Sequence, residues 1–331
     1  MSQEKKCPIR GTNFNEIFFE NFKKSLFYTE LYKKHEDELI IGVRDGYINI
    51  YYNCDSIAKI KNTSVNPELI TGELADYYLT GDNRILNYTS RSAQEILDNY
   101  EKIKSNSQKR EKLEKQAQER VFIDNNLNDN SDWFCIDVEY AKSYIENKKV
   151  RGWRFDIIAI SKKAPYRVAL IELKYGRNAI GGDSGINEHI KDYYEFHTNG
   201  SFKILKPELI SIIESLIKIG VDVPETLHGI RMEEFFSKPE YYFITLNNNK
   251  SGEKGATPME TMAGYLFTKD NAPKDWKAKK YSKDASENGY HSVVKGDKSF
   301  EPVFLFSEAT LPNLGIINIL DERYYTKKII N

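Results

Sequence analysis

Two apolar stretches of the sequence are each interrupted by charged residues that can take part in metal-dependent chemistry. Residues 168–174 read as four apolar residues followed by Glu172, a leucine and Lys174. Because side chains alternate along a strand, Glu172 and Lys174 are expected on the same face. Residues 155–160 carry a single acid, Asp156, in an otherwise apolar run. Buried charges are costly unless they are paired or bind a metal, so all three residues suggest a site.

Two carboxylates and a lysine have a clear use in phosphodiester hydrolysis. If the two stretches pair through the short turn at 161–165, Asp156 comes near Glu172. The carboxylates would then hold a hard divalent cation, Mg²⁺, with Mn²⁺ as a substitute. The cation would polarise a phosphoryl oxygen and lower the pKa of a bound water. Lys174 would orient or deprotonate that water and offset charge in the transition state.

Asp156, followed by Glu172-Leu173-Lys174 at the end of an apolar strand, resembles the PD-(D/E)xK, or restriction-endonuclease-like, superfamily. The resemblance covers residues 131–246, with Phe155 where the motif has proline. It implies an α/β (α+β) fold, in which a restriction-endonuclease-like core has a central mixed sheet flanked by helices. It also implies a Mg²⁺-dependent endonuclease, with DNA as the expected substrate. By analogy, such an enzyme can act as a homodimer.

Two other readings stay open beside the DNA nuclease. One is a nuclease that acts on RNA. The other is a catalytically inactive nucleic-acid-binding or scaffolding protein of the same fold, in which the buried acids are structural. The formal net charge of −1 decides nothing here, because a basic cleft can be balanced by acidic faces.

The superfamily often adds a glutamate from the helix before the core. Glu119 on an expected helix and Glu139 on the following expected strand both compete for this role. We favour Glu139, because Asp137 and Glu139 stand two residues apart in an apolar strand and are expected on one face.

Residues on either side of this triad are candidates for nucleic-acid contact. Arg154 precedes Asp156, and Arg177 follows Lys174. The glycine-rich stretch 176–185 is either a phosphate-binding turn, with Ser184 capping the next helix, or a flexible connection. His189 would lie one turn into that helix, as a substrate contact or as a surface or packing residue.

A lysine-rich segment follows later in the chain. Residues 269–298 are poorly periodic and interleave cations with aromatics at Lys274, Trp276, Lys277, Lys279, Lys280 and Tyr281. Such interleaving is typical of nucleic-acid contact, and a solvated loop is the competing interpretation.

Hydrophobic periodicity predicts three parts of the chain. Residues 1–105 form an α+β unit of unknown role, with helices at 13–36 and 67–78 and a hairpin around Asp45-Gly46. A long helix is expected at 90–121, where Ser90 is the N-cap. The nuclease core, 106–250, has strands at 134–141, 154–160, 168–174 and 241–246 and helices at 185–196 and 207–219. A C-terminal extension, 251–331, has weaker strands at 262–267 and 302–306.

The composition is that of an ordinary globular protein, with 331 residues, 40% of them hydrophobic and 29% charged. No apolar run approaches the roughly 20 residues of a membrane span. Cys7, Cys54 and Cys135 stand far apart, which excludes a zinc finger and favours a reduced, cytoplasmic setting.

Overall fold

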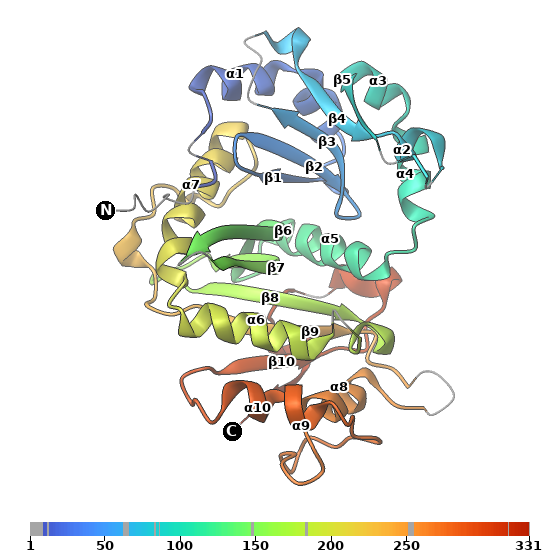
Figure 1. The fold of residues 1–331 in the computed structure, drawn as a ribbon. Helices are drawn as coiled ribbons and strands as arrows, with labels where there is room; N and C mark the ends of the chain where they lie inside the picture. The colour runs from blue at the N-terminus through green and yellow to red at the C-terminus, as the bar shows by residue number, and fades with distance from the viewer. Residues whose placement is uncertain are drawn as a thin grey trace.

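Two β-sheets organise the chain, and helices pack around them (Figure 1). The computed structural model describes residues 9–11, 13–61, 66–82, 84–85, 87–146, 149–182, 185–250, 255–316 and 318–330. For residues 144–146, 149–151 and 315–316 it describes the backbone alone. The first sheet is antiparallel and the second is mixed, so the expected α+β class is confirmed at this level.

The first sheet has five strands that follow one another in chain order. They are β1 (Ile40–Val43), β2 (Tyr47–Tyr52), β3 (Asp55–Lys61), β4 (Thr71–Ala75) and β5 (Tyr88–Ser92). The hairpin predicted at Asp45-Gly46 is confirmed, and Gly46 adopts the positive φ of +71° that the turn requires. Helix α1 (Glu16–Lys24) covers this sheet, because Phe18 and Phe22 share a core with Ile48.

Several helices predicted in the first part of the chain are wrong. The helix at 13–36 is divided into α1 and a π-helical segment, Phe27–Tyr32. The helix at 67–78 is replaced by a single 3-10 turn at Pro67–Leu69, strand β4 and the start of the short helix α2 (Tyr77–Thr80). The helix at 90–121 is three helices, α3 (Ala93–Asp98), α4 (Tyr100–Gln108) and α5 (Leu113–Asn126). Ser92, rather than Ser90, caps α3, because Ser90 pairs with Glu73 in the sheet.

The second sheet has six strands in the order β11-β10-β9-β8-β7-β6. They are β6 (Trp133–Glu146), β7 (Lys149–Ser161), β8 (Val168–Tyr175), β9 (Glu240–Leu246), β10 (Pro302–Phe306) and β11 (Thr326–Ile329). Strands β6, β7 and β8 are antiparallel neighbours, as the short turns between them predict. The pairs β8–β9 and β9–β10 are parallel.

Helices cover both faces of the second sheet. Ala117 and Val121 of α5 pack on one face, against Ile157 and Leu173. The other face is covered by α6 (Ile186–Thr198) and α7 (Phe202–Ile219), whose apolar side chains share a core with Phe155. The predicted order of a helix, three strands, two helices and a strand is therefore confirmed from α5 to β9.

The last part of the chain contributes to the same sheet. Strand β10 confirms the prediction at 302–306, but the strand predicted at 262–267 is wrong, because these residues belong to helix α8 (Pro258–Leu266). Thr257 and Glu260 form a capping box, and proline occupies the first helical position. Short helices α9 (Ala285–Asn288) and α10 (Tyr290–Val294) follow. Among the described residues, no helix combines the length and apolarity needed to cross a membrane.

Candidate active site

Asp156 lies where two neighbouring strands of the second sheet separate. The ladder between β7 and β8 ends at the pair Ile157–Ile171. One residue further along, a carboxylate oxygen of Asp156 accepts a hydrogen bond of 2.8 Å from the amide of Leu173. The Asp156 side chain thus replaces the backbone partner that Leu173 loses, and the carboxyl group is fixed at the opening between the strands.

Glu172 and Lys174 lie beside this opening, at the end of β8. Both residues are buried, Glu172 with 2% and Lys174 with 3% of its surface exposed. The Lys174 ammonium is 2.8 Å from Oε1 of Glu172. The strand alternation predicted for these two residues accounts for the contact, because Leu173 between them points into the α5-side core.

His189 of α6 completes this group. Its Nε2 is 3.0 Å from Oε1 of Glu172 and 3.2 Å from the Lys174 ammonium. The imidazole therefore contacts both members of the pair, one turn into the helix, as the sequence predicts for its position. In the structure, His189 contacts Glu172 and Lys174.

Burial and the neighbouring charges shift the pKa values of the ionisable groups in this site. Burial raises the pKa of Glu172 to about 7, although Lys174 opposes the shift. Burial and the nearby charge of Glu172 raise the pKa of Asp156 well above its usual range. Burial lowers the pKa of Lys174, but the carboxylates of Glu172 and Glu114 outweigh it, and the net shift is upward. Lys174 is accordingly an ammonium ion at neutral pH.

The first turn of α5 supplies two charged residues that the sequence analysis missed. Oε1 of Glu114 lies 3.6 Å from the Lys174 ammonium, and burial raises the pKa of this glutamate. The ammonium of Lys115 lies 3.2 Å from Oε2 of Glu139. Glu114 could have been found from its position in the first turn of the helix before the core. The sequence analysis missed it because it predicted one continuous helix through residue 110.

The structure separates the two acids that were expected on one face of β6. Glu139 lines the pocket beside Asp156, whereas Asp137 is fully buried between Arg10 and Arg44. A register shift between Cys135 and Asp137 and the positive φ of +52° at Glu139 interrupt the alternation of the strand. The expectation of a shared face is therefore wrong.

Glu119, the competing glutamate, lies elsewhere. Its carboxylate accepts hydrogen bonds from the amides of Asn53 and Cys54, in the turn between β2 and β3. Both turn residues have a φ of +53°. Burial raises the pKa of Glu119 to about 8. Glu119 thus joins α5 to the first sheet and is not among the residues that line the pocket.

The pocket around Asp156 and Glu172 has a volume of about 580 Å³. Arg154 is exposed at its edge, and Asn178, Ala179 and Gly181 line it from the glycine-rich stretch. Arg177 is partly exposed next to this stretch but does not line the pocket. The N-cap of α6 is Gly185, one residue after the predicted Ser184, which itself lies outside the described residues.

The donor set of the pocket fits a divalent cation bound through few protein ligands. Among the residues that the structure describes, no group of three or more His, Cys, Asp and Glu side chains is arranged to hold a metal. Asp156 and Glu172 are the hard oxygen donors that Mg²⁺ prefers, and Mg²⁺ keeps several waters in protein sites. A cation between these carboxylates would stabilise their charged forms, which burial disfavours in both groups.

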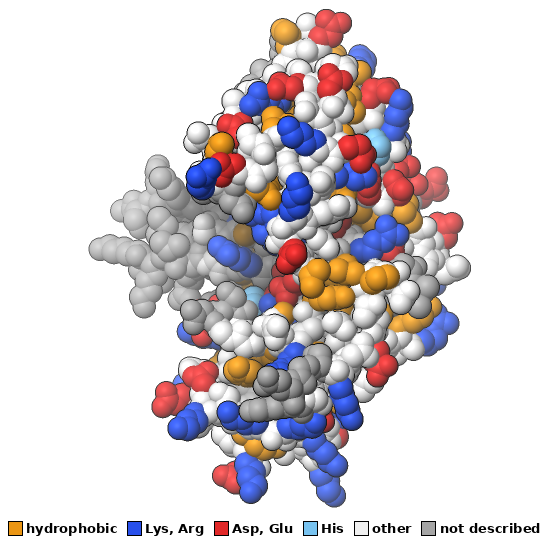
Figure 2. Space-filling view, turned by 90° about the vertical axis from the view of Figure 1, so that its right-hand side faces the viewer, with side chains coloured by type: hydrophobic (Ala, Val, Ile, Leu, Met, Phe, Trp, Pro, Cys, Tyr) orange, Lys and Arg blue, Asp and Glu red, His pale blue; other side chains and the backbone are white. Residues whose placement is uncertain are grey.

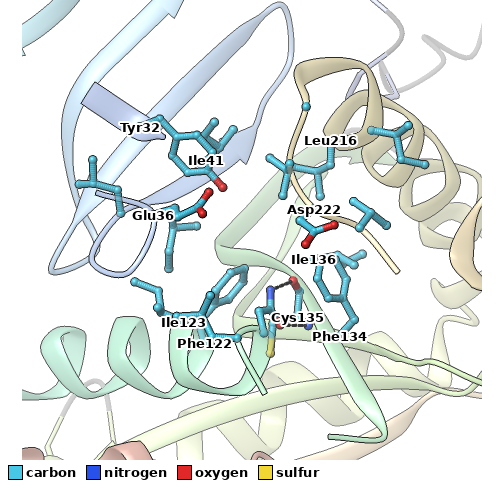
Figure 3. A pocket seen from close by; sticks show the side chains of 18 of the residues that line it. Tyr32, Glu36, Ile41, Phe122, Ile123, Phe134, Cys135, Ile136, Leu216 and Asp222 are labelled. Atoms are coloured by element: carbon cyan, nitrogen blue, oxygen red, sulfur yellow. Dashed lines mark hydrogen bonds between the residues drawn. The ribbon is translucent and has the colours of Figure 1, made fainter. Parts of the chain in front are cut away.

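A second pocket, of about 530 Å³, lies between the first sheet and the core. Figure 3 shows the carboxylates of Glu36 and Asp222 pointing into it, above apolar residues such as Phe122 and Phe134. It borders β6 at Phe134–Ile136, and its Glu36 pairs with Lys33 at 2.5 Å, but both of these side chains are exposed, unlike the buried pair of Glu172 and Lys174. The chemically equipped pocket is therefore the one beside β8.

No family model, curated protein or solved structure matches the chain.

Proposed function

We propose that the chain is a metal-dependent nuclease that hydrolyses phosphodiester bonds, with DNA as its expected substrate. The observation that carries this proposal is the convergence of Asp156, Glu172 and Lys174 in one pocket. The core from α5 to β9 supports it, because a mixed sheet between helices is what the PD-(D/E)xK resemblance implies. On this proposal the second sheet is a restriction-endonuclease-like core.

Asp156 and Glu172 would hold the cation, which is Mg²⁺ or its substitute Mn²⁺. When bound, it supplies Lewis-acid chemistry, polarising a phosphoryl oxygen and acidifying a water. The amide of Leu173 orients Asp156 for this role. His189 and Lys174 both contact Oε1 of Glu172, which orients the second carboxylate. Both acids are thereby preorganised before substrate binds.

Lys174 would stabilise charge that develops during hydrolysis. Its raised pKa keeps the side chain protonated, so the ammonium acts as a hydrogen-bond donor and a positive charge rather than as a base. It can orient the attacking water and offset negative charge on the phosphoryl group. Arg154, exposed at the edge of the same pocket, is suited to contact a phosphate of the substrate.

Cleavage of supercoiled plasmid tests this function. Wild-type protein is expected to nick or linearise the plasmid with Mg²⁺ or Mn²⁺ and to lose this activity in EDTA. Lys174→Ala should keep its fold and lose cleavage by roughly 100-fold or more, because a preorganised donor is removed. Lys191→Ala, which removes an exposed lysine of α6, is the matched control. A Lys174→Ala protein as active as the control would refute the assigned triad.

A catalytically inactive, nucleic-acid-binding or scaffolding protein is the second candidate function. Its supporting observation is that Lys174 and His189 already satisfy Oε1 of Glu172 without a cation. Under this alternative, divalent cations should leave the melting temperature unchanged. An RNA substrate is tested by including single-stranded and duplex RNA in the cleavage assay.

A further inference from the structure

The lysine-rich segment concentrates positive charge in a chain that is almost neutral as a whole. Residues 269–283 contain six lysines and two aspartates, a net charge of +4, whereas the complete chain has a net charge of −1. Asp275 forms an ion pair of 3.1 Å with Lys328, which offsets part of the negative charge in this segment. The side chains of Lys274, Lys277, Lys280 and Lys283 are exposed. None of these four forms an ion pair with another described residue.

The segment is held against the core. Trp276 is only 2% exposed and packs against Phe267, Phe304 and Phe306. The amide of Ser282 donates a hydrogen bond of 2.8 Å to the carbonyl of Gly264 in α8. A Cβ atom on Gly264 would collide with a backbone carbonyl of the segment, so the two backbones approach closely. The exposed lysines are therefore presented by an anchored backbone.

The buried tryptophan changes the interpretation of the cation–aromatic pattern. Interleaved lysines and aromatics predict base stacking, but the Trp276 ring is inside the core and cannot stack on a base. Tyr281 is partly buried and packs against the same core. What the segment offers to a ligand is therefore exposed ammonium groups, which suit contact with phosphates.

The segment is connected to the candidate active site through the glycine-rich stretch. Gly181 lines the pocket that holds Glu172, and it also lines a neighbouring pocket that Asp284 borders. Gly181 packs so closely on Tyr265 of α8 that a Cβ atom would collide with the tyrosine hydroxyl. In Figure 2, Lys and Arg side chains gather on the lower part of the face shown, over the elements around α8 and α9. The segment is thus linked to the pocket region through α8 and Gly181.

We propose that Lys274, Lys277, Lys280 and Lys283 form a docking surface for the sugar–phosphate backbone of the nucleic acid that flanks the cleaved bond. This inference rests on the proposed nuclease function and adds where the substrate is held outside the pocket. Because the contacts are with phosphates, binding through this surface is independent of sequence and strongly dependent on salt. DNA and RNA share this chemistry.

Binding to labelled nucleic acid tests the docking surface without cleavage. The parent protein is full-length Lys174→Ala in Mg²⁺, and the probes are a 30-base-pair DNA duplex and an RNA duplex of the same sequence. Fluorescence anisotropy is measured from low to high salt. The test variant replaces Lys274, Lys277, Lys280 and Lys283 with alanine. The control variant replaces four exposed lysines of α1, α4 and α7, which are Lys23, Lys24, Lys102 and Lys203.

The test variant should bind the preferred probe on the order of 10-fold more weakly near 0.1 M salt, with a salt dependence shallower by roughly 2 to 4 units. The control variant should stay within about 2-fold of the parent. Equal binding by the test and control variants would overturn the docking surface. Wild-type protein that binds these probes but cleaves no substrate would instead overturn the nuclease function and leave the surface standing.

Discussion

At the scale of single residues, Asp156 has a structural role and, on the proposed function, a chemical one. Its carboxylate accepts the amide of Leu173, which the β7–β8 ladder no longer pairs. The same carboxylate faces Glu172, and burial together with that acid raises the pKa of Asp156. The hydrogen bond needs only an oxygen acceptor, whereas cation binding needs the negative charge. The two roles can therefore be separated by substitution.

Asp156→Asn should keep the fold and abolish metal-dependent cleavage, because asparagine retains an acceptor for Leu173 but loses the charge. Asp156→Ala should in addition lower the free energy of unfolding by about 1–3 kcal/mol, because a buried amide is left unpaired. Urea denaturation measures the stability of both variants, and plasmid cleavage measures their activity. Equal stability of the two variants would show that the Leu173 hydrogen bond contributes nothing.

At the scale of elements, buried Arg44 joins the first sheet to the second, and buried Arg10 pairs with the same acid. Arg44, at the turn between β1 and β2, forms an ion pair of 2.6 Å with Asp137 of β6 and donates a hydrogen bond of 2.7 Å to the carbonyl of Val138. Arg10 pairs with the other oxygen of Asp137 at 3.1 Å and with Glu208 of α7 at 3.2 Å. These contacts hold the part of β6 that leads into Glu139.

Arg44→Leu should destabilise the protein by about 3 kcal/mol or more, because removing one partner leaves the buried carboxylate of Asp137 poorly compensated. Arg231→Leu is the control, since its ion pairs with Glu233 and Glu234 are largely exposed. That control should leave the free energy of unfolding nearly unchanged, because exposed ion pairs contribute little to stability. Thermal and urea unfolding measure the stability of both variants. Similar losses of stability would contradict a stabilising role for the ion pair between Arg44 and Asp137.

Which elements could be predicted depended on the range of the interactions that form them. Strands β6 to β9 have apolar patterns bounded by polar turns, so local sequence was sufficient for them. The same alternation predicted that Glu172 and Lys174 share a face. The irregularity that separates Asp137 from Glu139 has no such local pattern. Glu114 was missed because its approach to Lys174 depends on how α5 packs on the sheet.

At the scale of the whole molecule, charge is distributed unevenly. Glu172 is buried and Asp156 is half-buried beside it, while lysines are exposed on the anchored segment 269–283. The net charge of −1 conceals both features. A nuclease with this distribution would hold its substrate by phosphates outside the pocket and keep the cation inside it. The proposed function depends above all on these two carboxylates.

Stabilisation by Mn²⁺ tests the central claim most directly, because it requires no knowledge of the substrate. A cation at 100 times its dissociation constant stabilises the folded protein by about 2.7 kcal/mol, so the melting temperature should rise by several degrees. The wild type and Asp132→Asn, a control at an exposed acid, should show this rise, and Asp156→Asn should not. No rise in the wild type, or an equal rise in Asp156→Asn, would contradict a cation site at Asp156 and Glu172.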